Sequence, residues 1–466
     1  MKKETLRWEE DSIGKMEVPG GAYYGVQSLR GKENFPITGT GLHPEFIRAL
    51  VQIKKAAAIT NRDAGELAPS IAKAIIASCD EILEGKLTEN FVVDAIQGGA
   101  GTSANMNANE VIANRAIELL GGEKGDYSLV HPNDHVNMSQ STNDVIPTAG
   151  KITAIRLCRT LVAELELLSE SLYEKSKEFD DVLKMARTQL QDAVPMRLGQ
   201  NFSAYGAAVN RTLLGLEKFL GTYGRVNLGG TAVGTGINAS AYYLAHICPN
   251  LSAVTGEKLT RSSNLFDATE NLDYFVETSH HLKTIAVTLT KISNDLRLLS
   301  SGPIGGFGEL NLPPRQNGSS MMPGKVNPVI PEVVSQIAFL VMGHDVTITM
   351  AAQSGQCELN AFEPVLFYCL FQSAEFLARG VGTLRENCVK GITANRERCR
   401  EIVERSPSLA TALCPVLGYK KAAEIAKEAG RTGASVWDLA RREGLSPEEL
   451  SAILDPMGMT YQPGTV

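Results

Sequence analysis

Five long stretches of this chain repeat apolar residues at spacings of three and four, which is the period of an amphipathic helix. They cover residues 44–61, 153–178, 270–299, 333–350 and 364–384. The last two are more evenly apolar, which predicts burial on several sides. Strand patterns are few. Helices of this length, with few prolines inside them, predict an all-α fold whose core is a central bundle of long helices.

The size of the chain predicts more than one domain. With 466 residues it exceeds the length at which a single hydrophobic core usually stops growing, so we expect two or three domains. The segments from about 392 onward predict a small C-terminal helical domain. Within it, Ser446-Pro447-Glu448-Glu449 is typical of a capping box with proline at the first helical position.

Charge and cysteine usage narrow the function classes. The formal net charge is −7 and the basic residues are scattered, which argues against binding of nucleic acid or an anionic membrane. No stretch of 18 uninterrupted apolar residues is present, and no apolar run follows the first two lysines, so we predict a cytoplasmic protein. The eight cysteines form no CxxC pair, and most of them are expected to be small buried hydrophobic residues, with no pattern that supports a catalytic cysteine.

The segment GSSMMPGKVNP, residues 318–328, has the glycine, serine and lysine of a phosphate-binding loop. A P-loop needs four residues between its glycines and a hydroxyl after its lysine, placed between a strand and a helix. Here five residues separate Gly318 from Gly324, Val326 follows the lysine, and no strand pattern precedes the segment. Nucleotide binding is therefore not expected.

What this loop offers is suited to a small anion. Ser319 and Ser320 supply two adjacent hydroxyls, Lys325 a cation and Asn327 an amide. Together they could grip and deprotonate an anionic substrate, and the alternative is an ordinary surface turn.

Three further segments allow two interpretations each. Their hydroxyls and amides could face a carboxylate, or they could cap helices or serve as hydrogen-bonding partners. The residues concerned are Thr102 and Ser103 after the glycine-rich run 98–101, the row Ser141, Thr142, Asn143 and Asp144, and the pair Thr188 and Gln189 after Arg187. For His131 and His135 a hydrogen-bonded role in a helix connection is the more common case. Taken together, three such segments and one lysine favour a small dicarboxylate ligand.

The loop at 318–328 resembles the signature loop of the fumarase/aspartase superfamily. Residues 97–110, 131–144 and 186–195 resemble further conserved regions of that family, and 22–35 resembles its aspartate-deaminating branch. The resemblance implies a three-domain fold, with an N-terminal domain over 1–141, a central long-helix bundle over 142–394 and a C-terminal domain over 395–466. It also implies a homotetramer whose active sites are shared between subunits.

The resemblance implies a role for each candidate residue. Ser319 would be the general base, acting as an alkoxide that the N–H groups of the loop stabilise. Thr102, Ser141, Thr142 and Ser320 would hold the carboxylate that becomes an aci-carboxylate. Lys325, Asn327 and Thr188 would hold the other carboxylate, and Asn143 with Gln189 would face the departing ammonium. The loop from about 310 to 326 would close over the substrate.

One departure from the family pattern bears on the substrate. Many members have histidine after the threonine, whereas this chain has Gln189, which cannot serve as a general acid. An amine that leaves already protonated needs less acid help than hydroxide, so we predict L-aspartate deamination to fumarate and ammonia. A class II fumarate hydratase and a non-catalytic structural member are the alternatives. No cofactor is expected, and activation by Mg²⁺ is left open, as is a second anion pocket near His131.

Overall fold

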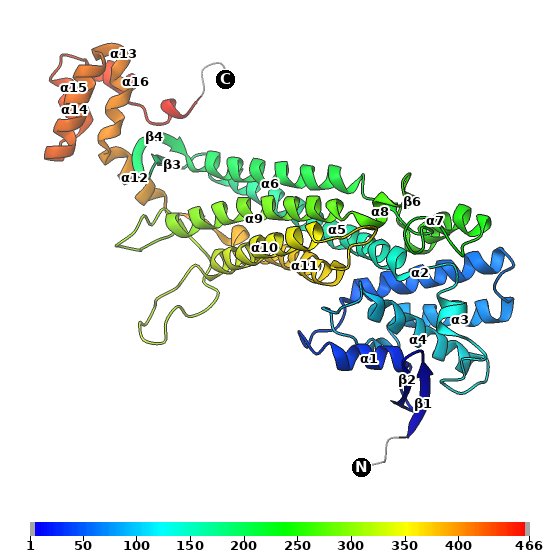
Figure 1. Ribbon diagram of the computed structural model, residues 1–466. Helices are drawn as coiled ribbons and strands as arrows, with labels where there is room; N and C mark the ends of the chain where they lie inside the picture. Colours follow the sequence, from blue (N-terminus) through cyan, green and yellow to red (C-terminus); the bar gives the residue numbers. More distant parts are fainter. Residues whose placement is uncertain (1–4, 462–466) are drawn as a thin grey trace. The chain divides into compact units, whose positions relative to one another are not determined.

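The computed structural model describes residues 5–461, and helices dominate it (Figure 1). Each predicted amphipathic stretch is a helix. These are α2 (Pro44–Asp63), α5 (Thr142–Glu178), α9 (Asp273–Leu299), α10 (Val329–Gln353) and α11 (Glu363–Asn387). The other helices are α1 (Val26–Asn34), α3 (Pro69–Leu83), α4 (Thr102–Leu119), α6 (Leu198–Leu220), α7 (Ala241–Thr255), α8 (Asp267–Glu270), α12 (Arg396–Arg405), α13 (Cys414–Leu417), α14 (Tyr419–Thr432), α15 (Val436–Arg441) and α16 (Pro447–Ile453).

The strands in the described chain are short and form two-stranded sheets. The pairs are β1 (Leu6–Asp11) with β2 (Gly14–Pro19), β3 (Leu183–Thr188) with β4 (Gln191–Arg197), β5 (Arg225–Val226) with β6 (Thr260–Arg261), and β7 (Leu310–Asn311) with β8 (Thr393–Ala394). Only β5 and β6 run parallel. The all-α class is therefore confirmed.

The chain divides into two compact units, each built from separate segments. The first comprises residues up to 162 together with 215–283 and 340–376, and the second comprises 163–214, 284–339 and the remainder from 377. Both contain lengths of the same long helices. In the first, the Phe275 ring of α9 lies 4.9 Å from the Phe367 ring of α11. In the second, the Tyr205 hydroxyl of α6 donates to Asp295 of α9 over 2.8 Å. The predicted three-domain division stays a prediction.

Helix α5 begins at Thr142, eleven residues before the predicted amphipathic stretch 153–178, because the helix tolerates a proline in its first turns. Pro147 lies inside the helix and has no N–H to give to the carbonyl of Asn143, four residues earlier. The side-chain amide of Asn227 donates to that carbonyl instead, over 3.0 Å. The helix can therefore start at Thr142, within the polar row singled out above.

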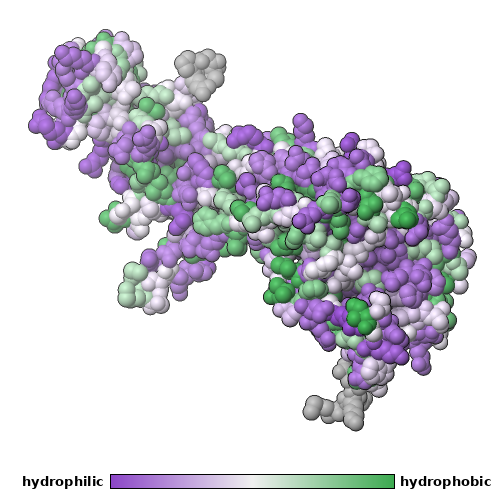
Figure 2. All heavy atoms as spheres, in the orientation of Figure 1, coloured by the Kyte–Doolittle hydropathy of each residue, from purple (hydrophilic) through white to green (hydrophobic). Residues whose placement is uncertain are grey.

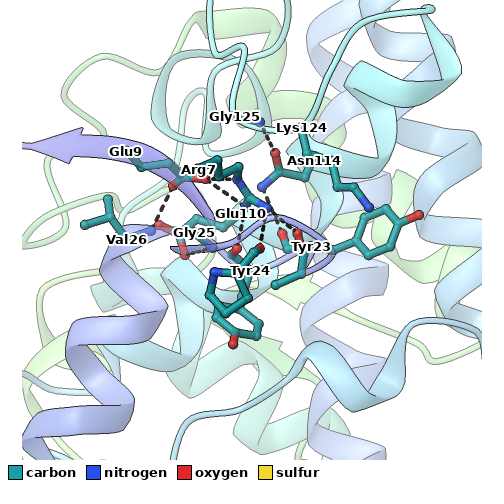
Figure 3. A network of polar contacts seen from close by, with 12 residues as sticks. Arg7, Glu9, Tyr23, Tyr24, Gly25, Val26, Glu110, Asn114, Lys124 and Gly125 are labelled. Carbon is teal, nitrogen blue, oxygen red and sulfur yellow. Dashed lines mark hydrogen bonds and ion pairs between the residues drawn. The ribbon is translucent and has the colours of Figure 1, made fainter. Parts of the chain in front are cut away.

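The N-terminal hairpin and α1 are held to α4 by buried charges (Figure 3). Arg7 donates to the backbone carbonyls of Pro19, Gly20, Ala22 and Tyr24, which fixes the segment before α1. Helix α1 has no side-chain cap of its own. Instead, Glu110 of α4 accepts the backbone N–H groups of Gly25, Gln27 and Ser28, and Glu9 accepts that of Val26. Burial raises the pKa of Glu110 to about 7.

Helix α10 exposes an apolar surface. Among residues 5–461 it is the one helix whose length and composition would suffice to cross a membrane, and 33% of its most apolar window is buried. Core helices of soluble proteins pass the same test. On the face of the molecule in Figure 2, hydrophobic and hydrophilic residues are mixed. The exposed apolar residues of α10 are Val333, Phe339, Leu340, Val346 and Met350.

Two smaller predictions are confirmed. Ser446 and Glu449 form the capping box at the start of α16, with Pro447 at its first position. All eight cysteines are free, and six of them are buried: Cys79, Cys158, Cys248, Cys369, Cys388 and Cys399.

Candidate active site

The glycine-rich bend before α4 has a left-handed backbone. Gly101 is the N-cap residue with φ of 85°, and a Cβ there would lie 3.0 Å from the Ile146 side chain, so a larger residue would be strained twice over. The Thr102 hydroxyl donates to the Gly99 carbonyl over 2.7 Å. Neither Thr102 nor Ser103 caps the helix, so the capping interpretation of this pair is wrong.

The row at 141–144 is fixed by a buried carboxylate. Asp144 accepts the backbone N–H groups of Ser141, Gly229 and Thr231 over 2.9, 2.9 and 3.0 Å. Burial raises its pKa to about 6, against the effect of these three donors. The Ser141 hydroxyl accepts the N–H of Asn143, as a capping residue would, and the Asn143 amide donates to the Ala232 carbonyl. Asp144 therefore sets the backbone that presents Ser141, Thr142 and Asn143.

A chain of side-chain amides connects Thr142 to a buried lysine. Asn105 donates to the Thr142 hydroxyl and to Asn137 Oδ1, over 3.2 Å each. Lys54 of α2 donates to Asn137 Oδ1 over 2.8 Å and to Gln140 Oε1 over 2.9 Å. Lys54 is fully buried, and burial lowers its pKa to about 7. This network was not predicted from the sequence, although the position of Lys54 on the apolar face of its helix was a signal for it.

Thr102 and His131 line one cavity of about 490 Å³, together with Arg30 and Glu110. His131 Nδ1 accepts the N–H groups of Asn133 and Asp134, and His135 accepts the N–H of His131. Both histidines thus have the hydrogen-bonded role that the sequence favoured.

The signature loop crosses over itself at its ends. Gly318 N–H donates to the Lys325 carbonyl over 2.8 Å, and the Asn327 side chain donates to the Gly318 carbonyl over 2.8 Å. A Cβ at Gly318 would lie 2.5 Å from the Lys325 oxygen, so glycine is required there. The Ser319 hydroxyl oxygen accepts two backbone N–H groups, from Met321 over 3.1 Å and Met322 over 2.9 Å. Two donors aimed at one oxygen stabilise negative charge on it.

The base of this loop opens into a cavity of about 1040 Å³. Its charged lining residues are all cations, Arg297, Lys325 and Arg398, and Asn327 also lines it. The exposed Ser320 lies in the same loop. This charge balance suits an anionic ligand.

Thr188 and Gln189 lie at the tip of the β3–β4 hairpin, in the same unit as the signature loop. Gln189 and Leu190 form its two-residue turn, with φ of 54° and 62°. The structure thus brings Thr102, Ser141, Thr142 and Asn143 into the first unit, and Thr188, Gln189 and the four loop residues into the second. Within the second, none of the hydrogen bonds of the described residues joins Ser319 to Thr188 or Gln189.

The chain matches known protein families over most of its length. The model of a family described as "Lyase" matches residues 14–343, and one described as "Fumarase C C-terminus" matches 409–461. The chain is 50% identical to the aspartate ammonia-lyase of Bacillus subtilis, covering 99% of this chain and 97% of that protein. It is 50% identical to the aspartate ammonia-lyase of Pseudomonas aeruginosa, covering 98% and 97%.

Solved structures show the same fold. A Brucella melitensis protein described as fumarate lyase:delta crystallin, bound to cobalt, matches with a TM-score of 0.95 and 50% identity over 98% of this chain and all of that one. The class II fumarase of Schistosoma mansoni matches with a TM-score of 0.94 and 35% identity, over 98% and 99% of the two chains.

Proposed function

The chain belongs to the fumarase/aspartase superfamily of lyases, and we propose that it catalyses the reversible deamination of L-aspartate to fumarate and ammonia. The names of relatives at about 50% identity over nearly the whole chain support this substrate. The enzyme is a carbon-nitrogen lyase that acts on a small dicarboxylate.

The geometry at Ser319 carries the proposed mechanism. The base must remove a weakly acidic proton from the carbon next to a carboxylate, and a serine can do this only as an alkoxide. The N–H groups of Met321 and Met322 already point at its oxygen, so the charged form is stabilised before substrate arrives.

The remaining donors hold the substrate. Thr102, Ser141, Thr142 and Ser320 bind the carboxylate that gains charge as the aci-carboxylate forms. Each such donor in a dry site contributes about 2.7–4 kcal/mol to the stability of the transition state. Lys325, Asn327 and Thr188 hold the second carboxylate, which fixes the carbon skeleton between them.

The leaving group needs no acid. Asn143 and Gln189 face the ammonium, which departs with the protons that it already carries, so the reaction requires no cofactor. Closure of the loop at 310–326 excludes water from the carbanion.

A homotetramer in the cytoplasm completes the proposal, with active sites shared between subunits. The exposed apolar residues of α10 support it, since such a surface is stable in water when partner chains cover it. In a symmetric homotetramer the α10 helix of each of the four chains would be buried in the same way.

Two substrates in one assay test the function. Purified protein is given L-aspartate, and fumarate is followed by its ultraviolet absorbance. Fumarate from aspartate and none from L-malate is the expected result. Fumarate from malate alone would indicate the hydratase, which the 35% identity to a class II fumarase makes the relevant competitor. Fumarate from neither would favour a structural member.

A further inference from the structure

The hairpin that carries Thr188 is irregular. Strands β3 and β4 pair with a register shift between Met185 and Arg187. Side chains of a regular strand alternate between its two faces, so Lys184 and Arg187 would point to opposite sides. Met185 pairs with Pro195 and Arg187 with Asp192, so the bulge places one additional residue on β4 and distorts the hairpin at this point. Although they lie three positions apart on β3, Lys184 and Arg187 both reach one carboxylate, that of Glu309.

This carboxylate is enclosed. Glu309 is 0% exposed, its Oε1 lies 2.6 Å from Arg187 Nη1, and its Oε2 lies 3.4 Å from Lys184 Nζ. The Arg187 guanidinium also stacks 4.1 Å from the centre of the Phe307 ring. An arginine paired with a buried carboxylate in this way resists separation, because Glu309 would keep only the more distant Lys184 as its counter-charge.

The same pair joins two segments that the reaction uses. Arg187 directly precedes Thr188, whose side chain is exposed at the hairpin tip. Glu309 directly precedes β7, from which the chain runs on toward the signature loop. The turn at Gln189 and Leu190 has left-handed backbone at two non-glycine residues, a conformation that persists only where neighbouring contacts impose it. Arg187 is the ion-paired residue of β3 that lies nearest to that turn.

We propose that Arg187 is a positioning residue for the deamination: its ion pair with Glu309 maintains the bulge, turns Thr188 toward the substrate and sustains the left-handed turn at Gln189. The proposal rests on the proposed function. Arg187 touches no substrate and acts through Thr188.

A double-mutant cycle on L-aspartate tests it. Arg187→Met should lower kcat/KM about 100-fold, as displacement of a binding group by about 1 Å does. Thr188→Ala should lower it comparably, and the double variant should lose little more than the worse single variant. Arg197→Met is the matched control. Arg197 lies on β4 of the same sheet, at the end away from the turn, where it pairs with Asp180 and stacks on Tyr461. Losses that multiply in the double variant, or an equal loss in the control, would overturn the proposal.

A second measurement needs no catalysis. Amide hydrogen exchange of the segment 183–197 should be at least about tenfold faster in Arg187→Met than in Arg197→Met, because the turn loses its anchor. Equal protection would contradict the proposal even if the protein acts on another substrate. If Arg187→Met does not fold, Glu309→Gln takes its place in both experiments, because this substitution breaks the same ion pair and keeps the size of the side chain. If the unsubstituted protein formed no fumarate from L-aspartate, that result would contradict the proposed function and not the role of Arg187 in the hairpin.

Discussion

The side-chain amide of Asn105 donates to the Thr142 hydroxyl over 3.2 Å. A residue of α4 therefore orients the Thr142 hydroxyl, which is proposed to bind a carboxylate of the substrate at the start of α5. Asn109, one helical turn further on, donates to the same Asn137 oxygen as Asn105 but does not reach Thr142. The two asparagines are equally buried. Substitutions at Asn105 and Asn109 therefore separate what these hydrogen bonds contribute to stability from what they contribute to substrate binding by Thr142.

Asn105→Ala should lower kcat/KM for L-aspartate about tenfold more than Asn109→Ala, although both should lower the free energy of unfolding by about 1–3 kcal/mol. The reason is that only Asn105 holds the Thr142 hydroxyl. Steady-state kinetics and urea denaturation of the two variants measure both quantities. Equal activity losses would mean that Thr142 needs no such support.

Ser319→Ala should reduce kcat about 10²–10⁴-fold, since it removes the proposed general base. Fumarate binding and oligomeric state should stay as in the unsubstituted protein. Ser320→Ala, in the same loop, should mainly raise KM because that hydroxyl is proposed to bind a carboxylate. A Ser319→Ala variant with near-normal turnover would remove the base assignment.

Lys54 should make stability depend on pH above neutrality. Its pKa is about 7 in the folded protein and about 10.4 in an unfolded chain, so between these values the unfolded state holds more protons. The free energy of unfolding should therefore increase with pH in this window, by up to about 1.4 kcal/mol per unit. Urea denaturation from pH 7.5 to 9.5 should show a steeper increase in the unsubstituted protein than in Lys54→Met. Parallel curves would show that Lys54 keeps its proton when folded.

Phe339→Asp should dissociate the proposed homotetramer and abolish activity. Phe339 is 61% exposed on α10, and a charge there could not be covered by an apolar partner surface. Light scattering and activity report the two effects. Tyr419→Asp is the control, because Tyr419 is 82% exposed on α14 and should tolerate the change. A Phe339→Asp variant that remains tetrameric would exclude this face as an interface.

The long helices were predictable because their apolar faces repeat over many turns. Their ends were not, since α5 begins at Thr142 only because Asn227 donates to the Asn143 carbonyl that Pro147 cannot reach, a contact between residues 84 positions apart. The β3–β4 hairpin was missed for a similar reason. Its turn is Gln189-Leu190, which contains none of the glycine or asparagine that usually marks a left-handed turn.

The candidate residues themselves were found from short motifs, whereas their supports were not. Asp144 was noted only as part of a polar row, and its role in holding three backbone N–H groups depends on the chain folding back from residues 229–231. Lys54 falls on the apolar face of α2, but the sequence does not show which amides it meets there. Buried polar partners of this kind are chosen by tertiary structure, so one sequence does not reveal them.

Helix α1 owes its beginning to Glu110, which lies 85 positions after Gly25. During synthesis from the N-terminus, the α1 segment leaves the ribosome well before that carboxylate exists. Until α4 emerges, the N–H groups of Gly25, Gln27 and Ser28 therefore lack the carboxylate that accepts them in the folded protein. The order of translation thus determines when α1 can form with its native cap. A fragment ending before residue 110 should fail to form this helix.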